Sequence, residues 1–229
     1  MSERENILAR IREALSVPAP LPGRHPDGGH GGQSPRSAAA GARQWLPPVG
    51  ETFDQQVQLF RANAVELKAE FHLLASVGVL APLVRKLGEA EGWKRVALHP
   101  AELTEAAANA LGLPALRTDQ PYDVNQLEAC DAGFTGCDAL IAQTGSVLVT
   151  SRSAGGRALS VLPPHHVVLA RREQLLPDLP AAFDLLQRNY AGNYPSFISF
   201  ITGPSRTGDI ERILVLGAHG PKKLTIVCI

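Results

Sequence analysis

Residues 95–112 read RVALHPAELTEAAANALG and join a short apolar run to a helical pattern. The run 95–98 has the continuous apolar character of a strand that is buried on both faces. Pro100 lies near the start of the pattern that follows, where a helix tolerates proline, and Gly112 marks its end. A strand followed at once by a helix is the repeating unit of a parallel sheet, so this stretch predicts an α/β fold.

Upstream of this stretch the apolar spacing is helical. It predicts a helix near residues 3–16, a long helix over 52–75 and a shorter helix over 80–91. Thr52 and Gln55 have the spacing of a capping box, which places the start of the long helix.

Residues 17–50 are rich in proline and glycine and include the run PDGGHGG. This composition is typical of a linker or mobile arm, and a solvated loop accounts for His25 and His30 better than a metal site does. The sequence therefore predicts an N-terminal helix and Pro/Gly-rich arm over 1–50 and an α/β domain over 51–229.

Downstream of Asp131 the apolar runs become short and strand-like. Residues 151–156 resemble a hairpin loop between two of these runs, and 178–190 read as a helix with Pro180 in its first turn. The expected strands are 132–134, 139–142, 147–149, 158–161, 166–170, 196–201, 213–216 and 224–229. Helices in the first half and strands in the second predict a sheet with covering helices and an antiparallel element.

Composition excludes several classes of protein. The 22 basic residues balance 22 acidic ones, so no bulk field attracts nucleic acid or an anionic membrane. No apolar run approaches the ~20 residues of a membrane helix, and the N-terminus has no signal-peptide core, which makes the cytoplasm the expected location. Three cysteines without a CxxC pair argue against a disulfide framework and against an iron–sulfur cluster, which takes four thiolates.

Several catalytic signatures are also missing from the sequence. It contains no GxGxxG after a strand, no GxSxG and no HExxH, which disfavours a dinucleotide site, a hydrolase elbow and a helical zinc site. The spacing of Gly203 and Gly208 imitates a P-loop, but Asp209 stands where lysine is required, so a triphosphate site is rejected.

The first candidate site is the turn Thr144-Gly145-Ser146 between two strand-like runs. Such a turn offers backbone N–H groups and two hydroxyls at one point, a set able to hold a phosphate or carboxylate. The alternative is a hairpin turn that needs glycine only for its φ angle.

The second candidate is the polar block around Arg206. Arginine binds carboxylate or phosphate with two parallel hydrogen bonds, and Ser205 and Thr207 flank it as donors. Asp209 is suited to orient Arg206 or to cap a short helical turn. An internal pair of Arg206 with Asp209 or Glu211, which only shapes the loop, is the alternative.

The third candidate is His219 in the turn GAHGP, as a proton carrier, an oxyanion donor or a residue that locks the turn. Because neighbouring strand residues face opposite sides, at most one of His165 and His166 should face a given pocket. His72, expected in the long helix, and His99, at the end of a strand, have structural roles in this interpretation.

Five of these blocks, taken in order, resemble the lactate-utilization (LUD) domain family over most of residues 52–229, and the N-terminal helix and arm resemble its lactate utilization protein C branch. The blocks are GCD at 136–138, IAQTGS at 141–146, LPPHH at 162–166, GPSRTGDIE at 203–211 and GAHGP at 217–221. Many members carry Glu before Thr-Gly-Ser. This chain has Gln143, which can neither ionise nor act as a general base.

The resemblance implies a NagB/RpiA/CoA transferase-like α/β sandwich whose loops bind anionic substrates. It implies a non-redox subunit that acts with two iron–sulfur partner proteins in the oxidation of L-lactate to pyruvate. The clusters then belong to the partners, and this chain is expected to hold neither cofactor nor metal. An assembly or regulatory protein without chemistry, and an independent transferase or isomerase, are the alternatives, so whether the chain is itself an enzyme stays open.

A small anionic metabolite is expected between the Thr144–Ser146 turn and the Arg206 loop. The residues expected to bind it are Thr144, Gly145, Ser146, Ser205, Arg206 and Thr207. The residues expected to take part in catalysis are His219, Arg206 and Asp209.

Overall fold

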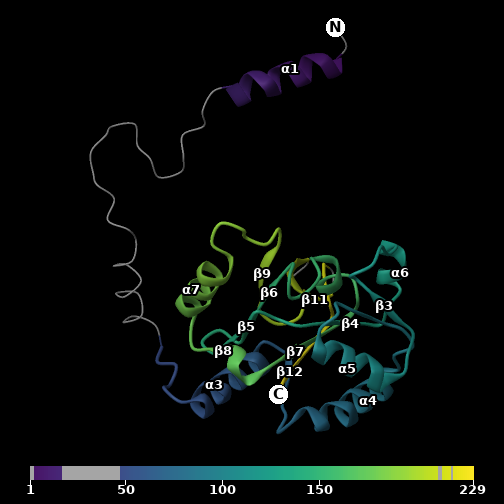
Figure 1. Cartoon of the computed structure of the whole chain (residues 1–229), viewed down its shortest axis with the longest axis vertical. Coiled ribbons are helices and arrows are strands. Elements are labelled where there is room, and N and C mark those ends of the chain that lie inside the picture. Colours follow the sequence, from purple (N-terminus) through teal and green to yellow (C-terminus); the bar gives the residue numbers. More distant parts are fainter. Residues whose placement is uncertain (1–2, 17–46, 211–212, 218) are drawn as a thin grey trace. The chain divides into compact units, whose positions relative to one another are not determined.

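The computed structural model describes residues 3–16, 47–210, 213–217 and 219–229, in two units, Met1–Leu46 and Pro47–Ile229. In the first unit, α1 (Glu3–Ser16) confirms the helix expected near 3–16 (Figure 1). The predicted arm falls mostly at 17–46, outside the described residues, so the predicted domain boundary at residue 50 stays a prediction.

A six-stranded parallel sheet forms the centre of the second unit. Its order is β1-β12-β7-β4-β2-β3, and each pair of neighbouring strands is parallel. The strands are β1 (Glu70–Leu73), β12 (Lys223–Cys228), β7 (His165–Ala170), β4 (Ala132–Thr135), β2 (Val96–Leu98) and β3 (Ala115–Arg117). The four central strands are almost wholly buried, as their apolar sequences require.

Helices α4 (Leu80–Glu91) and α5 (Glu102–Leu111) cover one face of this sheet (Figure 1). Trp93, Phe134 and Leu169 lie in the apolar cluster between them and the strands. Gly112 ends α5 with a φ of +63°, the left-handed conformation that favours glycine, as the sequence predicted.

A second sheet of four strands packs against the other face. Its order is β8-β5-β6-β9, with β8 (Leu175–Leu176), β5 (Ala139–Ile141), β6 (Ser146–Thr150) and β9 (Ile198–Ile201). Helix α3 (Phe53–Glu66) joins the core between the sheets, and α7 (Leu179–Tyr190) packs against the second sheet through a separate cluster. The mixed α/β class and its antiparallel element are therefore confirmed.

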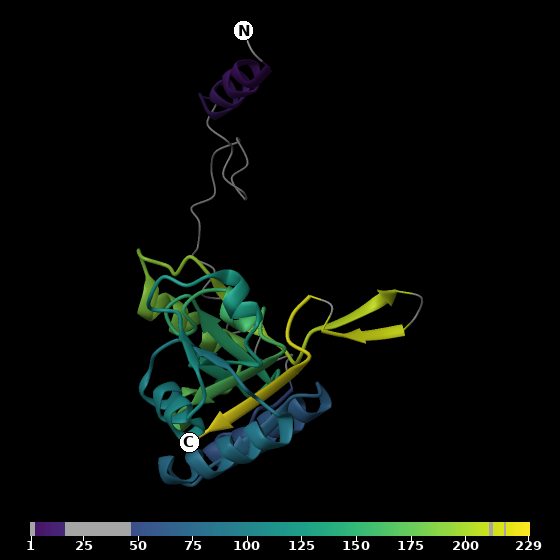
Figure 2. The ribbon, with the colours of Figure 1, turned by 90° about the vertical axis from the view of Figure 1, so that its right-hand side faces the viewer.

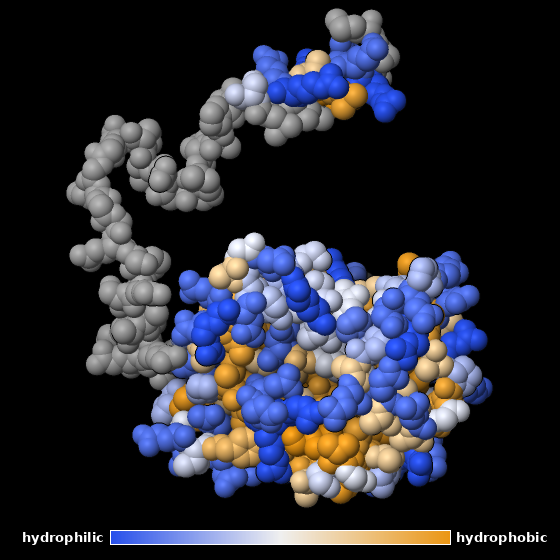
Figure 3. Space-filling model, in the orientation of Figure 1, coloured by the Kyte–Doolittle hydropathy of each residue, from blue (hydrophilic) through white to orange (hydrophobic). Residues whose placement is uncertain are grey.

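A two-stranded antiparallel ribbon, β10 (Arg206–Ile210) with β11 (Ile213–Leu216), extends away from this body (Figure 2). The short helix α6 (Val124–Glu128) and the strands β3 and β8 are elements that the sequence patterns did not predict. On the face seen in Figure 3, hydrophilic and hydrophobic residues are interspersed over the larger unit. Among the helices that the structure describes, none has the length and apolar character needed to cross a membrane.

The long helix expected over 52–75 is wrong beyond Glu66. The capping box of Thr52 and Gln55 is present, but Lys68 adopts a φ of +69° and β1 follows. Phe71 still packs in the core, where its ring lies 5.0 Å from that of Phe60. Its apolar position therefore continued the helical spacing of the preceding residues, although it belongs to a strand. Residues 70–73 form a strand because they pair with β12, which is distant in the sequence. His72 is consequently not in a helix.

The strand expected over 158–161, and with it the hairpin across 151–156, is also wrong. Residues Ala158–Ser160 form a single 3-10 turn, and β6 pairs with β5 and β9 instead. Leu159 is buried against Ala97, Leu127 and Cys130. It is apolar because it packs over the sheet, not because it belongs to a strand of the sheet.

Gly133 in β4 lies against this turn, which generates a stability prediction. An added Cβ would lie 2.6 Å from the Leu159 carbonyl oxygen and 3.1 Å from a Pro163 carbon. We expect Gly133→Ala to lower the free energy of unfolding by about 1–3 kcal/mol through overpacking. Gly78→Ala is the matched control, because its nearest atom in the structure is 3.7 Å away. Equal stability of the two variants in urea unfolding would contradict the close approach.

Candidate functional site

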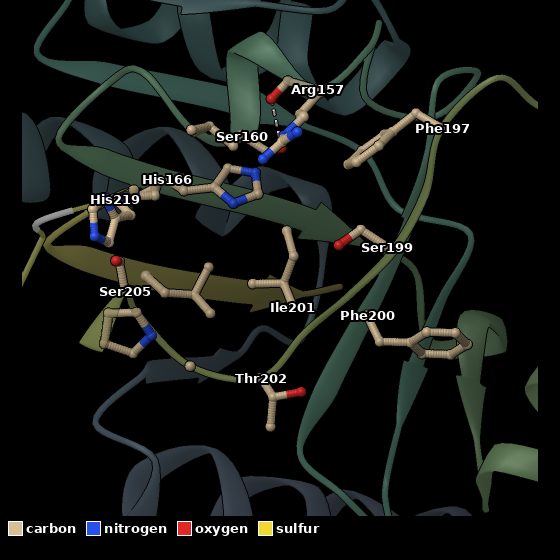
Figure 4. A pocket seen from close by; sticks show the side chains of 16 residues that line it. Arg157, Ser160, His166, Phe197, Ser199, Phe200, Ile201, Thr202, Ser205 and His219 are labelled. Carbon is tan, nitrogen blue, oxygen red and sulfur yellow. Dashed lines mark hydrogen bonds between the residues drawn. The ribbon is translucent and has the colours of Figure 1, made fainter. Parts of the chain in front are cut away.

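A cavity of about 280 Å³ lies beside the amino-terminal halves of β7 and β12 (Figure 4). Strand β9 and the loop after it form a further wall, with Ser199, Thr202 and Gly203 in the lining. Ser205 and His219 line it as well, so two sequence blocks that were separate candidates meet at one cavity.

Backbone hydrogen bonds at the base of the ribbon hold these two blocks together. The Ser205 N–H donates to the Pro221 carbonyl, and the Gly217 N–H donates to the Ser205 carbonyl, both at 2.9 Å. A Cβ on Gly220 would lie 3.2 Å from the Ser205 Cβ, which shows how closely the blocks approach. These contacts at the base of the ribbon place Ser205 and the exposed His219 on the same wall of the cavity.

His166 is the buried polar group of this cavity. It is 1% exposed, and burial lowers the pKa of its imidazole to about 3, so the ring is neutral near pH 7. Its Nε2 shares a hydrogen bond of 2.8 Å with the Thr135 hydroxyl, whereas Nδ1 has no partner among the described residues. A neutral ring with one free nitrogen is able to accept or donate one hydrogen bond, according to its tautomer.

His165 faces the opposite side of β7, as the strand period predicted. Its Nε2 shares a hydrogen bond of 2.8 Å with Thr225, and its ring packs edge-on at 5.2 Å from that of Trp93. Burial lowers its pKa too. The expectation that only one of the two histidines faces a given pocket is confirmed.

Arg157 supplies the cationic group of the cavity, and the sequence analysis missed it. It lies in the turn that packs over the sheet, and its carbonyl accepts a hydrogen bond of 3.0 Å from the Ser160 hydroxyl. Figure 4 shows its side chain extending between Ser160 and His166. The only sequence signal was its place after Gly155-Gly156, which ordinary loop composition equally explains.

The structure gives Arg206 a different position from the one expected. It begins β10, is exposed, and is not among the residues that line the cavity. Because Asp209 lies within a strand, a helical turn capped by it is wrong. The side chains of Thr207 and Asp209, and the whole of Glu211, lie outside what the structure describes, so their roles stay predictions.

The turn Thr144-Gly145-Ser146 joins β5 to β6 as a hairpin. Gly145 has a φ of +65° and packs on α3, where a Cβ would lie 2.8 Å from the Ala64 nitrogen, so a hairpin role for glycine is confirmed. The turn does not line the cavity, but the Ser146 and Thr202 hydroxyls share a hydrogen bond of 2.8 Å. It therefore supports the β9 loop from behind, and ligand binding by the turn itself stays a prediction.

The described residues contain no group of three or more His, Cys, Asp or Glu side chains arranged to hold a metal ion. Cys130, Cys137 and Cys228 are free and buried, and burial raises the pKa of Cys228 to about 11, which keeps that thiol protonated. The expectation that this chain carries no metal or cofactor stays a prediction.

The neutral state of buried His166 predicts an acid-sensitive stability. The unfolded state takes up a proton near pH 6.5 that the folded ring refuses down to about pH 3, so stability is present above this window and is lost as pH falls through it. We expect His166→Gln to flatten the dependence of unfolding free energy on pH by up to about 1.4 kcal/mol per pH unit.

Urea unfolding at several pH values measures this slope. Leu224→Ala is the control, because Leu224 is buried beside His166 on β12 but does not titrate. This variant should therefore lower the free energy of unfolding by the same amount at every pH. An unchanged slope in His166→Gln would show that the folded ring takes up its proton as readily as the unfolded one.

The family model described as the LUD domain matches residues 99–229, which include every cavity block discussed above. The chain is 29% identical over 150 residues to lactate utilization protein C of Deinococcus radiodurans, covering 65% of this chain and 69% of that protein. It is 25% identical over 199 residues to lactate utilization protein C of Bacillus subtilis, covering 81% and 83%.

A solved structure has a similar fold. The crystal structure of a DUF162 family protein from Deinococcus radiodurans superposes with a TM-score of 0.59 at 22% identity, covering 78% of this chain and 99% of that chain. At this identity the likeness concerns the α/β fold alone. The narrower likeness to NagB/RpiA/CoA transferase-like proteins stays a prediction.

Proposed function

Because the chain belongs to the LUD domain family, within its lactate utilization protein C branch, we propose that it acts in lactate utilization as a non-redox subunit. It binds a small anionic metabolite in the cavity beside β7 and β12. The observation that carries this proposal is the meeting of Ser205, His219, Arg157 and the unpartnered His166 around one cavity.

The chemistry of the cavity suits a 2-hydroxy or 2-oxo monocarboxylate. The Arg157 guanidinium offers two parallel donors to a carboxylate, the strongest contact such a ligand can make. Ser199 and Ser205 offer hydroxyls, and neutral His166 offers one nitrogen without adding charge. A volume of about 280 Å³ is at the small end for ligand pockets, which fits a metabolite of few heavy atoms.

The redox step belongs, in this proposal, to two iron–sulfur partner proteins. The three cysteines support this division, because they are buried, scattered over separate elements and too few for a cluster with four thiolates. The chain then presents or releases the anion, and His219 at the cavity wall carries a proton or steadies an oxyanion.

The direct test is lactate oxidation with an artificial electron acceptor. It compares this chain alone, the two iron–sulfur proteins without it, and all three together. We expect activity only in the complete mixture. Equal activity without this chain would overturn the proposal, and turnover by the chain alone would make it an independent transferase or isomerase.

Arg157 and Arg206 compete for the role of carboxylate ligand, and mutation separates them. We expect Arg157→Ala to raise the lactate concentration for half-maximal activity by roughly tenfold to a hundredfold, because a charged hydrogen bond contributes about 1.5–3 kcal/mol. Arg206→Ala should have little effect on this concentration, and Arg157→Lys should recover part of the loss.

Steady-state kinetics of the complete mixture make the measurement, with circular dichroism as the folding control. If Arg206→Ala caused the loss and Arg157→Ala did not, the ligand would lie at the Arg206 loop, as the sequence-based hypothesis has it, and not in this cavity.

A second candidate function is assembly of the partner complex, and the projecting ribbon supports it. A two-stranded ribbon is marginally stable in water by itself, so β10 and β11 gain from a partner surface (Figure 2). Replacing residues 207–215 by a short Gly-Ser turn should then abolish co-purification with the iron–sulfur proteins while metabolite binding persists. Retained co-purification would leave the ribbon without an assembly role.

A further inference from the structure

A second cavity of about 240 Å³ lies at the opposite, carboxyl-terminal edge of the parallel sheet. His99 and Pro100 follow β2, Gly136 and Cys137 follow β4, and Arg171 follows β7, and all five line it. None of its lining residues is shared with the cavity of the proposed function.

This edge is where the chain changes sides. From β2 it passes to α5, which packs on one face of the sheet, and from the neighbouring β4 it passes to β5, which packs on the other. Connections that leave adjacent strands in opposite directions open a crevice between them, and ligands of open α/β sheets bind in such crevices. The second cavity occupies this crevice.

The charged groups around the cavity favour an anion. Among the lining residues, all of which the structure describes, the fixed charges are those of Arg152, Arg171 and Glu102. Arg171 donates to Glu102 at 2.5 Å, but the two side chains are 39% and 75% exposed. An exposed ion pair contributes little, so Arg171 is able to exchange this partner for a ligand at small cost.

The remaining polar groups of the cavity are neutral. Burial lowers the pKa of His99, whose Nδ1 shares a hydrogen bond of 3.0 Å with Thr118, and burial raises the pKa of the Cys137 thiol. Asp138, next in the chain, accepts hydrogen bonds from Ser153 at 2.5 Å and from the Tyr190 hydroxyl, and it does not line the cavity. Glu102 is therefore the only carboxylate in the lining, while Asp119 and Asp138 act on His99 and Cys137 from outside it.

Helix α5 begins at this cavity, and the backbone N–H groups of its first turn are further donors for a ligand, beside the two arginines. The Thr104 hydroxyl accepts from the Ala101 N–H at 2.9 Å and donates to the His99 carbonyl at 2.7 Å, which fixes the helix start to the end of β2. The N-cap residue is Ala101, whose methyl group cannot accept a hydrogen bond from the first turn.

We propose that this second cavity binds the phosphate group of a small phosphorylated metabolite, held by Arg152, Arg171 and the first turn of α5. Two guanidinium groups match the charge of a phosphate, and their planar donors suit its oxygens. The volume leaves room for a few further heavy atoms against Leu103 and Leu169. The site does not depend on the proposed function.

Phosphorus-31 NMR and isothermal titration with inorganic phosphate test the site on the full chain. We expect wild-type protein to bind phosphate, and Arg152→Ala and Arg171→Ala each to weaken binding tenfold or more. Arg188→Ala, on α7 and lining neither cavity, should bind as wild type does. Absence of binding by the wild type, unchanged binding in both Arg152→Ala and Arg171→Ala, or loss of binding in Arg188→Ala would each overturn the proposal.

Three further variants give readouts that a structural role alone would not. Glu102→Gln frees Arg171 and should tighten phosphate binding several-fold. Ala101→Asp and Ala101→Asn both supply the missing cap and should raise the melting temperature, but only the aspartate repels phosphate and should weaken its binding several-fold. Equal phosphate affinity of the aspartate and asparagine variants, or no tightening in Glu102→Gln, would contradict a phosphate at this position.

Discussion

The insertion of β12 between β1 and β7 is the constraint on which the larger unit depends. Parallel ladders join it to β1 on one side and to β7 on the other. Further backbone bonds close its end, where Leu74 donates to the Cys228 carbonyl and Ile229 donates to the Ala170 carbonyl. Segments that are far apart in the sequence thus become neighbours, and without this strand β1 would have no partner in the sheet.

The same insertion places the chemistry of the first cavity. Pro221 and Gly220 lead directly into β12, so the strand's register brings His219 and the base of the ribbon to the cavity wall. Leu224 pairs with His166 across the ladder, which sets the imidazole among apolar neighbours and keeps it neutral. Packing and the protonation state of the site therefore share one physical cause, which is the burial of β7 and β12.

The parallel sheet also separates two cavities with different linings. At the amino-terminal side, hydroxyls and imidazoles surround a cavity with one guanidinium. At the carboxyl-terminal edge, two arginines and a helix start converge where the chain changes faces. Because side chains alternate along β7, His165 and His166 lie on opposite faces of the sheet. His165 hydrogen-bonds with Thr225, and His166 hydrogen-bonds with Thr135.

Local sequence alone determined the α/β class, the α4 and α5 helices and the opposite orientations of the two histidines, because apolar period, strand alternation and capping residues act within a few positions. Only the tertiary structure decided that Phe71 belongs to a strand, that the 158–160 segment caps the sheet, and that Arg157 and not Arg206 lines the cavity. Each of these outcomes depends on a partner far away in the sequence. The spacing of apolar residues indicates which side chains are buried. It does not give their hydrogen-bond and packing partners, which form only when strands distant in the sequence pair.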